Sequence, residues 1–231
     1  MLTGSSAAAY KLTRSAGGLA VDGQDVSFSS DAVVNAATFS AGIAPGGLFT
    51  IFGSGLAGAG APTKVTLDGE SAIVLSATPF QVNAQVPPDF PAGSYTLRIE
   101  SPFGATTQSI QVRETAPAIF LVGANQGAAV NQGGEINSAT RPAPRGGVVV
   151  IYGTGFGSVS SQGTLLVVRT PMTAVLNGAE LPVAFAGLTP GFIGLYQANV
   201  LIPRTSPPGL NLPLSLRQAG SDSNLIYLAI Q

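Results

Sequence analysis

The sequence contains no cysteine and no histidine, and these two absences remove much of the chemistry that enzymes use. Without cysteine the chain has no disulfide, no thiol nucleophile and no thiolate metal ligand. Without histidine it lacks the commonest general base and the commonest transition-metal ligand. We therefore expect a protein that is not an enzyme, with no catalytic residues, no metal site and no cofactor.

Charged residues are also scarce, at 9% of the 231 residues, against about 25% in average soluble domains. Ten basic and eleven acidic side chains leave a net charge of -1, and neither sign forms a run. Nucleic-acid binding depends on clustered positive charge, so no nucleic-acid partner is expected. No stretch approaches the roughly 18 to 20 apolar residues of a membrane span, so membrane insertion is not expected either.

A hydrolase that uses carboxylates alone is the remaining enzymatic alternative, because Asp68 and Glu70 are close in sequence. Acid–base work would require such a pair to meet in a cleft. Both residues instead fall at a predicted hairpin turn, and their counterparts in the second half, Asn177 and Ala179, carry no charge. The sequence therefore does not favour this alternative.

The chain contains an internal duplication. Residues 46–56 (GGLFTIFGSGL) recur 100 positions later as residues 146–156 (GGVVVIYGTGF), and five of the eleven positions are identical. Each copy predicts one β-strand that is entered through a glycine pair and left through Gly-x-Gly. The duplication indicates two copies of one domain, which we place at residues 32–115 and 116–231.

Short apolar runs separated by Gly, Pro and Asn predict β-strands in both halves. In the first half we expect strands at residues 48–52, 64–67, 73–77, 81–86, 93–100 and 106–112. Asp68-Gly69 and Asn177-Gly178 predict matching hairpin turns, because these residues tolerate positive φ. Gly or Pro interrupts nearly every window that could form a helix. The predicted fold class is all-β, with two tandem immunoglobulin-like sandwiches, and extra residues of the second are expected around 158–171 and 188–194.

Residues 1–31 precede the duplicated part and form an N-terminal extension in this scheme. Alternation at Val21, Val26 and Phe28 predicts a short strand or hairpin there. The segment is a candidate donor strand that would complete a sheet of a neighbouring copy. Such an exchange is head-to-tail, need not close, and would produce a filament.

Two polar motifs supply the candidate ligand-binding residues. Gln81 and Asn83 in the first half correspond to Gln197 and Asn199 in the second, where Tyr196 precedes the pair. Alternating amides on an exposed strand can hydrogen-bond a sugar or a neighbouring strand. An aromatic ring at a strand end can stack on a sugar. Solvent-facing alternation and core packing are the competing explanations, and they apply equally to the other aromatic candidates, Phe103, Phe156, Phe192 and Tyr227.

The repeated pattern of Gly-Gly, an apolar strand and Gly-Ser/Thr-Gly-Leu/Phe resembles the opening strands of the IPT/TIG group of immunoglobulin-like domains. Residues 34–39, 43–47, 79–87, 116–120, 127–131 and 191–200 together resemble the uncharacterised C-terminal domain of large secreted acidobacterial proteins of the Solibacter type. This resemblance covers roughly residues 32–231. It implies a terminal module of an exported protein and carries no assigned catalytic residue or ligand.

We therefore expect a non-enzymatic structural or adhesive module that is extracellular or on the cell surface, with an export signal that is absent from this chain. Its expected partners are other copies of itself or other extracellular proteins. A self-assembling filament that uses the N-terminal segment for strand addition is the sharper version of this expectation. The alternative is a carbohydrate-binding accessory module of a secreted protein, with glycans as partners.

Overall fold

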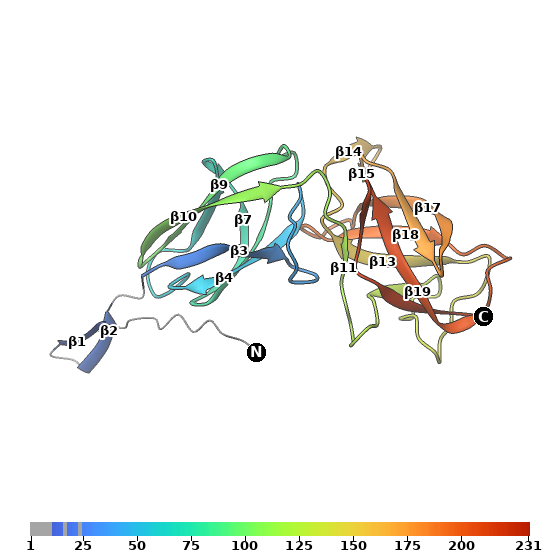
Figure 1. Cartoon of the computed structure of the whole chain (residues 1–231), viewed down its shortest axis with the longest axis horizontal. Helices are drawn as coiled ribbons and strands as arrows, with labels where there is room; N and C mark the ends of the chain where they lie inside the picture. The colour runs from blue at the N-terminus through green and yellow to red at the C-terminus, as the bar shows by residue number, and fades with distance from the viewer. Residues whose placement is uncertain (1–10, 16–17, 23–24) are drawn as a thin grey trace.

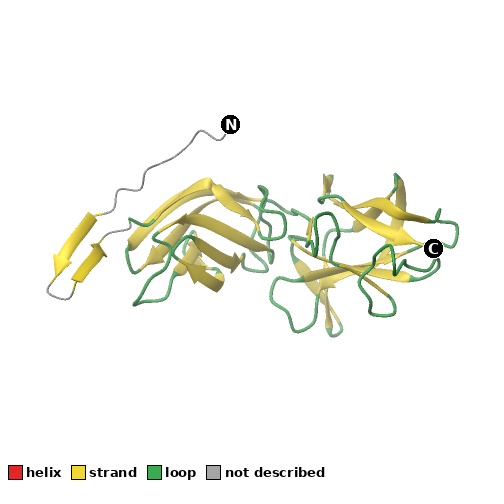
Figure 2. Ribbon diagram, turned by 90° about the horizontal axis from the view of Figure 1, so that it is seen from below, coloured by secondary structure: helices red, strands yellow, loops and turns green. Residues whose placement is uncertain are grey.

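The computed structural model describes residues 11–15, 18–22 and 25–231 of the chain. As predicted, these residues form β-strands and loops and no helix (Figure 2). Accordingly, none of them belongs to a helix that could span a membrane. Two β-sandwiches follow one another end to end along the long axis of the molecule (Figure 1), and each has its own hydrophobic core.

The first sandwich consists of two antiparallel sheets of four strands each. One sheet has the order β3-β4-β8-β7, formed by Ser27–Asn35, Leu48–Ser54, Gln81–Gln85 and Ile73–Thr78. The other has the order β10-β9-β5-β6, formed by Gly104–Val112, Gly93–Ser101, Lys64–Leu67 and Glu70–Ser71. In chain order these strands reproduce the ABED and CFG sheets of an immunoglobulin-like domain, with one strand added beside C.

Alternating side chains explain why these segments become strands. Phe49 and Ile51 of β4 point inward and are fully buried opposite Ala84 and Val82 of β8. The strand predicted at 64–67 coincides with β5, and the other five predicted strands overlap β4, β7, β8, β9 and β10. The hairpin between β5 and β6 turns at Asp68, whose φ of 45° confirms the predicted turn chemistry.

The second sandwich repeats this topology. β13 (Val148–Thr154) and β18 (Tyr196–Leu201) pair as β4 and β8 do. β17 (Ala179–Leu188) changes sheets along its length, because its first half pairs with β16 (Met172–Leu176) and its second half with β18. The remaining strands of the core are β11 (Ala118–Ile119), β12 (Ala129–Asn131), β19 (Gly209–Gln218), β20 (Ser221–Asp222) and β21 (Ile226–Ile230).

The second sandwich has an additional hairpin in the region 158–171, where extra residues were expected. It consists of β14 (Val159–Gln162) and β15 (Leu165–Val168). Val167 of β15 pairs with Gly187 of β17, so the hairpin covers this edge of the sheet. The corresponding edge of the first sandwich is β7, which has no further partner among the described strands. Ile73 and Leu75 on this open edge are exposed.

The N-terminal segment contains β1 (Lys11–Ser15) and β2 (Gly18–Asp22), which pair antiparallel and confirm the predicted hairpin. Residues 1–10, 16–17 and 23–24 of the predicted donor segment lie outside the described residues. β3 begins at Ser27, inside the segment 1–31 that the sequence assigned to an extension. The physical reason is that Phe28 pairs with Gly53 of β4 and packs in the first core together with Val26.

Candidate functional site

The two sandwiches meet where the duplicated glycine motifs face each other. Residues 113–117 connect β10 to β11, and Ala116 N at the end of this connection donates a hydrogen bond to Gly155 O. Gly47 of the first copy packs directly on Gly155 of the second, since a Cβ on Gly47 would lie 2.9 Å from the Gly155 Cα. The absence of side chains at both positions allows this close approach of two backbones. We call this contact between the sandwiches the joint.

Tyr196 lies at the centre of the joint and is fully buried. Its hydroxyl donates between two carbonyl oxygens, that of Gly157 at 2.8 Å and that of Pro45, in the first sandwich, at 3.2 Å. Its ring centroid lies 5.2 Å from that of Phe156. Gly46 must be glycine here because a Cβ at this position would overlap the Tyr196 hydroxyl. One side chain of the second sandwich thus contacts the backbone of the first directly.

Burial raises the pKa of the Tyr196 phenol above its ordinary value of 10.0, and the negative charge of Asp89 raises it further. The phenol therefore keeps its proton, and its role as a donor, across the neutral pH range. Because the joint covers the ring completely, the prediction that Tyr196 stacks on a sugar is wrong for this arrangement of the sandwiches.

Thr154 adds a second set of specific hydrogen bonds to the joint. Its Oγ1 accepts a hydrogen bond from Leu48 N at 2.7 Å and donates one to Gly194 O at 2.8 Å. Asn35 contributes a third contact by donating from Nδ2 to Ala116 O at 3.1 Å. Buried polar groups are stabilising only when they are paired, so these bonds fix one relative position of the two sandwiches.

Gln81 and Asn83 lie on the outer face of the β3-β4-β8-β7 sheet. Asn83 Oδ1 accepts hydrogen bonds from Thr50 Oγ1 at 2.8 Å and from Gln81 Nε2 at 2.9 Å, and Asn83 Nδ2 donates to Ser76 Oγ at 3.0 Å. The amide of Asn83 therefore links β4, β8 and β7 in a polar ladder. Cross-strand pairs of this kind stabilise a sheet.

Gln197 and Asn199 occupy the same positions on β18 of the second sandwich, where their amides make one mutual hydrogen bond of 3.2 Å. Val150 lies opposite Asn199, where the first sandwich has Thr50, so the ladder is not repeated. The structure thus places two of the predicted amides on each sandwich. None of the four forms a site together with the buried ring of Tyr196. Their ligand-binding role stays a prediction.

The predicted carboxylate pair, Asp68 and Glu70, lies at the hairpin between β5 and β6. Asp68 Oδ1 accepts a hydrogen bond from Thr96 N at 2.7 Å, which ties the hairpin to β9, while Glu70 is exposed. Within residues 25–231 no three acidic side chains gather into a group that could hold a metal ion.

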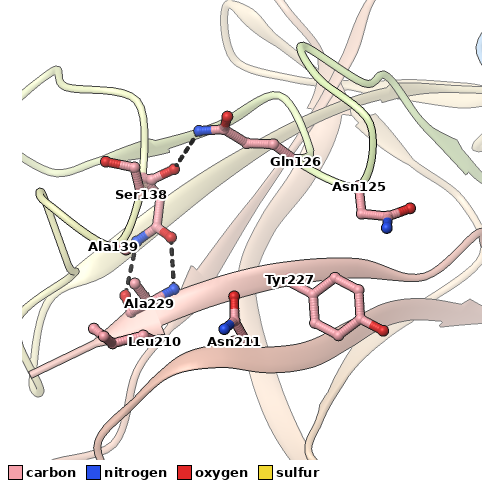
Figure 3. A pocket seen from close by; sticks show the side chains of 9 residues that line it. Asn125, Gln126, Ser138, Ala139, Leu210, Asn211, Tyr227 and Ala229 are labelled. Carbon is pink, nitrogen blue, oxygen red and sulfur yellow. Dashed lines mark hydrogen bonds between the residues drawn. The ribbon is translucent and has the colours of Figure 1, made fainter.

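A cavity of about 450 Å³ opens in the second sandwich, and neither Gln197 nor Asn199 borders it. Figure 3 shows the side chains that border it, which include Asn125, Gln126, Ser138, Leu210, Asn211 and Tyr227. The sequence singled out only Tyr227 of this set. A usable signal was the Val-Asn pair at 34–35 and again at 130–131, because both asparagines pair with the duplicated strand. Aligning these pairs shows that the second copy is longer on both sides of Asn131, where the cavity residues lie.

No protein-family model matches the chain, and no curated protein matches it. Among solved structures, it is similar to the surface glycan-binding protein PbSGBP-B from Prevotella bryantii, with 12% identity over 87% of this chain and 41% of that chain and a TM-score of 0.31. It is similar to SGBP-B from a complex xyloglucan utilization locus in Bacteroides uniformis, with 10% identity over 89% and 48% and a TM-score of 0.33.

The titin immunoglobulin tandem domains are similar at 12% identity over 82% of this chain and 91% of that chain, with a TM-score of 0.26. The chain spans less than half the length of the two surface glycan-binding proteins. At TM-scores this low, the likenesses carry no inference about a ligand or a function.

Proposed function

We propose that the chain is a non-enzymatic extracellular structural module that holds two immunoglobulin-like sandwiches in one fixed arrangement. The observation that carries this proposal is the joint, in which the buried hydroxyl of Tyr196 reaches both Gly157 and Pro45. A short connection and direct backbone packing leave little of the freedom that a flexible tether would allow. Such a unit would space or link larger components outside the cell or on its surface, including other extracellular proteins.

Two further lines support this proposal. The resemblance of residues 32–231 to the C-terminal domain of secreted acidobacterial proteins, with IPT/TIG-like repeats, supports an exported module. The composition supports a role without catalysis, because the sequence has neither cysteine nor histidine. The carboxylate pair at the β5–β6 hairpin adds to this, since Asp68 is engaged in holding that hairpin.

Small-angle X-ray scattering of the purified chain tests the structural role. A fixed joint predicts a scattering curve that one arrangement of the two sandwiches reproduces without an ensemble. A curve that requires sandwiches in many unrelated orientations would overturn the proposal. In parallel, hydrolysis of ester, glycoside and peptide substrates is expected at the level of buffer alone, and turnover by the purified chain would overturn its non-enzymatic part.

Self-assembly into a filament is a second candidate role, and the open edge of β7 favours it. The matching edge of the second sandwich is covered by β15, whereas Ile73 and Leu75 of β7 remain exposed. An uncovered edge strand presents unpaired backbone groups to another chain. We infer that β7 is the acceptor and that the donor lies in residues 1–24, since residues from Val26 onward belong to the first core.

The joint itself does not offer a second route to a filament. Its buried Pro45 corresponds to Arg145 at the far end of the second sandwich. Repeating the joint between two chains would therefore bury the Arg145 cation against a neighbour, which is costly without a partner. Strand addition at β7 requires no such burial.

Electron microscopy of the full chain and of a variant lacking residues 1–24 tests the filament. Polymers of the full chain that disappear in the shortened chain and in Leu75→Lys would support strand addition at β7. The control is Leu165→Lys, which adds the same charge at an exposed position of β15. Polymers that persist in the shortened chain would rule out the N-terminal donor, and a full chain that stays monomeric would end the idea.

A further inference from the structure

The geometry points to a binding site for a neutral oligosaccharide in the cavity of the second sandwich that Tyr227, Asn211 and Asn125 border (Figure 3). This inference goes beyond the structural role proposed above, because the cavity shares no residue with the joint. The volume of the cavity, about 450 Å³, falls within the roughly 300 to 1,000 Å³ of small-molecule sites.

The floor of the cavity is held by a buried asparagine. Asn137 Oδ1 accepts a hydrogen bond from Ala229 N at 2.8 Å, and Asn137 Nδ2 donates to Ala229 O and to Asn131 Oδ1, both at 2.9 Å. Gln126 Nε2 donates to Asn137 O at 2.9 Å and so ties the neighbouring loop to the same point. These bonds fix the surface against which a ligand would lie, and a preformed site loses less entropy on binding.

The wall of the cavity is made by an aromatic ring and by a strand that bulges. Tyr227 of β21 points out of the sandwich and is 38% exposed. The register between β19 and β21 shifts between Gly209 and Leu212, which places Leu210 and Asn211 in an irregular stretch. Bulges next to sites re-aim side chains, and here both Leu210 and Asn211 border the cavity.

Free amides stand beside the ring. Asn125 is held next to Tyr227 because Asn125 O accepts a hydrogen bond from Tyr227 N at 3.3 Å. Among the described residues, the side-chain amides of Asn125 and Asn211 and the Tyr227 hydroxyl make no hydrogen bond to the protein. Figure 3 shows Asn125 and Tyr227 toward one end of the cavity and Asn211 nearer its middle. Their donors and acceptors are therefore available to a ligand.

This combination fits a pyranose better than other small ligands. A sugar with equatorial hydroxyls presents an apolar C–H face, which packs on an aromatic ring, and a rim of hydroxyls that both donate and accept hydrogen bonds. An amide also donates and accepts, so it pairs with adjacent hydroxyls without adding charge. Leu210 also borders the cavity and is exposed, so it adds apolar surface to the lining.

The lining also sets the charge and length of the ligand. No Lys, Arg, Asp or Glu borders the cavity, so a charged ligand would lose its hydration without gaining a counter-ion. A second hollow of about 500 Å³ shares Gln126 and Ser138 with the first, and its two charged residues, Glu135 and Arg141, form an ion pair with each other at 4.0 Å. The two together have room for a chain of several sugars, which favours an oligosaccharide over a monosaccharide.

The duplication provides an internal comparison for this site. Asn35 and Asn131 both pair with the duplicated strand, opposite Phe49 and Val149. Asn35 binds the inter-sandwich connection through Ala116 O, whereas Asn131 accepts the hydrogen bond that holds Asn137. The same ancestral position therefore serves the joint in one copy and the cavity in the other, and the longer loops beside Asn131 supply the cavity walls.

Isothermal titration of the full chain with cellotetraose, laminaritetraose and maltotetraose tests the proposal, with tetragalacturonate as the charged comparison. We expect at least one neutral tetrasaccharide to bind with a micromolar to millimolar Kd and tetragalacturonate not to bind. Tyr227→Ala is expected to weaken binding about tenfold, through loss of ring stacking. Asn211→Ala is expected to weaken it about fivefold.

Phe192→Ala is the matched control, because Phe192 is an exposed ring in the same sandwich and outside the cavity. This variant is expected to bind like the unmodified chain. Thermal unfolding of each variant shows that a loss of binding is not a loss of folding. The proposal is overturned if no neutral tetrasaccharide binds at a ligand concentration of about 10 mM, which is tenfold above a Kd of about 1 mM. It is also overturned if Tyr227→Ala binds with the affinity of the unmodified chain, or if only peptides bind the cavity.

Discussion

The hydroxyl of Tyr196 in the second sandwich lies 3.2 Å from the carbonyl oxygen of Pro45 in the first. The two residues are 151 positions apart in the chain, and the bond is buried. A buried hydrogen bond between two domains restricts their relative position, because breaking it leaves polar groups without partners. The arrangement of the sandwiches is therefore a property of particular residues, and each of them can be changed.

Replacing Tyr196 with Phe removes only the hydroxyl. Two buried carbonyl oxygens lose their donor, so we expect the free energy of unfolding to fall by roughly 1 to 3 kcal/mol. Tyr152→Phe is the control, since this half-buried tyrosine on β13 lies outside the joint, and a change within about 0.5 kcal/mol is expected. Urea unfolding measures both. Equal losses in the two variants would show that the Tyr196 hydroxyl has no special role.

The same phenol predicts a loss of stability at alkaline pH. Folding raises its pKa above the ordinary 10.0, mainly through burial, so ionisation favours the unfolded chain. The stabilisation is complete below pH 10 and declines above it, by about 1.4 kcal/mol for each pH unit. The unfolding free energies of the unmodified chain and of Tyr196→Phe should therefore keep a constant difference up to about pH 10 and converge as the pH rises above it. Parallel pH profiles would contradict the burial of this group.

Alanine substitutions at two equivalent glycines distinguish the loss of stability caused by strain in the turn from the loss caused by disrupting the joint. Gly46 and Gly146 both have positive φ, of 69° and 85°, so alanine at either is expected to cost about 1 kcal/mol. Only at Gly46 would the new methyl group also overlap the Tyr196 hydroxyl, whereas at Gly146 it meets the flexible side chain of Arg204. Gly46→Ala should therefore lose more stability and also increase the hydrodynamic radius.

The outcome that counts against this reasoning is equal behaviour of the two alanine variants. Sedimentation velocity and thermal unfolding on the same samples give both quantities. If Gly46→Ala were as compact and as stable as Gly146→Ala, close packing at the joint would not be required for the arrangement.

The polar ladder on the first sandwich predicts a difference between two asparagines. Asn83→Ala removes the acceptor of the buried Thr50 hydroxyl and the partner of Ser76, so we expect a loss of about 1 to 2 kcal/mol. Among the described residues, the Asn199 side chain makes one hydrogen bond, which its Oδ1 accepts from Gln197 Nε2, and its replacement should cost about 0.5 kcal/mol or less. Chemical denaturation of both variants tests this. A larger loss at Asn199 would contradict the ladder.

Local features of the fold could be predicted because they depend on neighbouring residues. The strand at residues 64–67 follows from alternation, and the turn at Asp68 and Gly69 follows from the conformations that these two residues tolerate. The boundary at residue 32 was harder to place, because the irregular register between Phe28 and Val33 interrupts the alternation of β3. Its first part therefore resembles a separate segment.

The burial of Tyr196 could not be predicted in this way. Its sequence neighbours place it at the start of a strand, and the equivalent Phe80 in the first sandwich is indeed exposed. The difference arises because Pro45 and Gly46 of another domain cover Tyr196. The cavity is non-local too, since it joins Asn125 to residues of β19 and β21 that lie far along the chain.

The distance between two spin labels, one on each sandwich, tests the fixed joint most directly. The sequence has no cysteine, so Thr107→Cys on β10 and Ser161→Cys on β14, both exposed positions, would be the only labelled sites. Double electron–electron resonance should give one narrow distance distribution, which broadens when Gly46→Ala is added. A broad distribution in the chain with intact Gly46, unchanged by that substitution, would contradict the account.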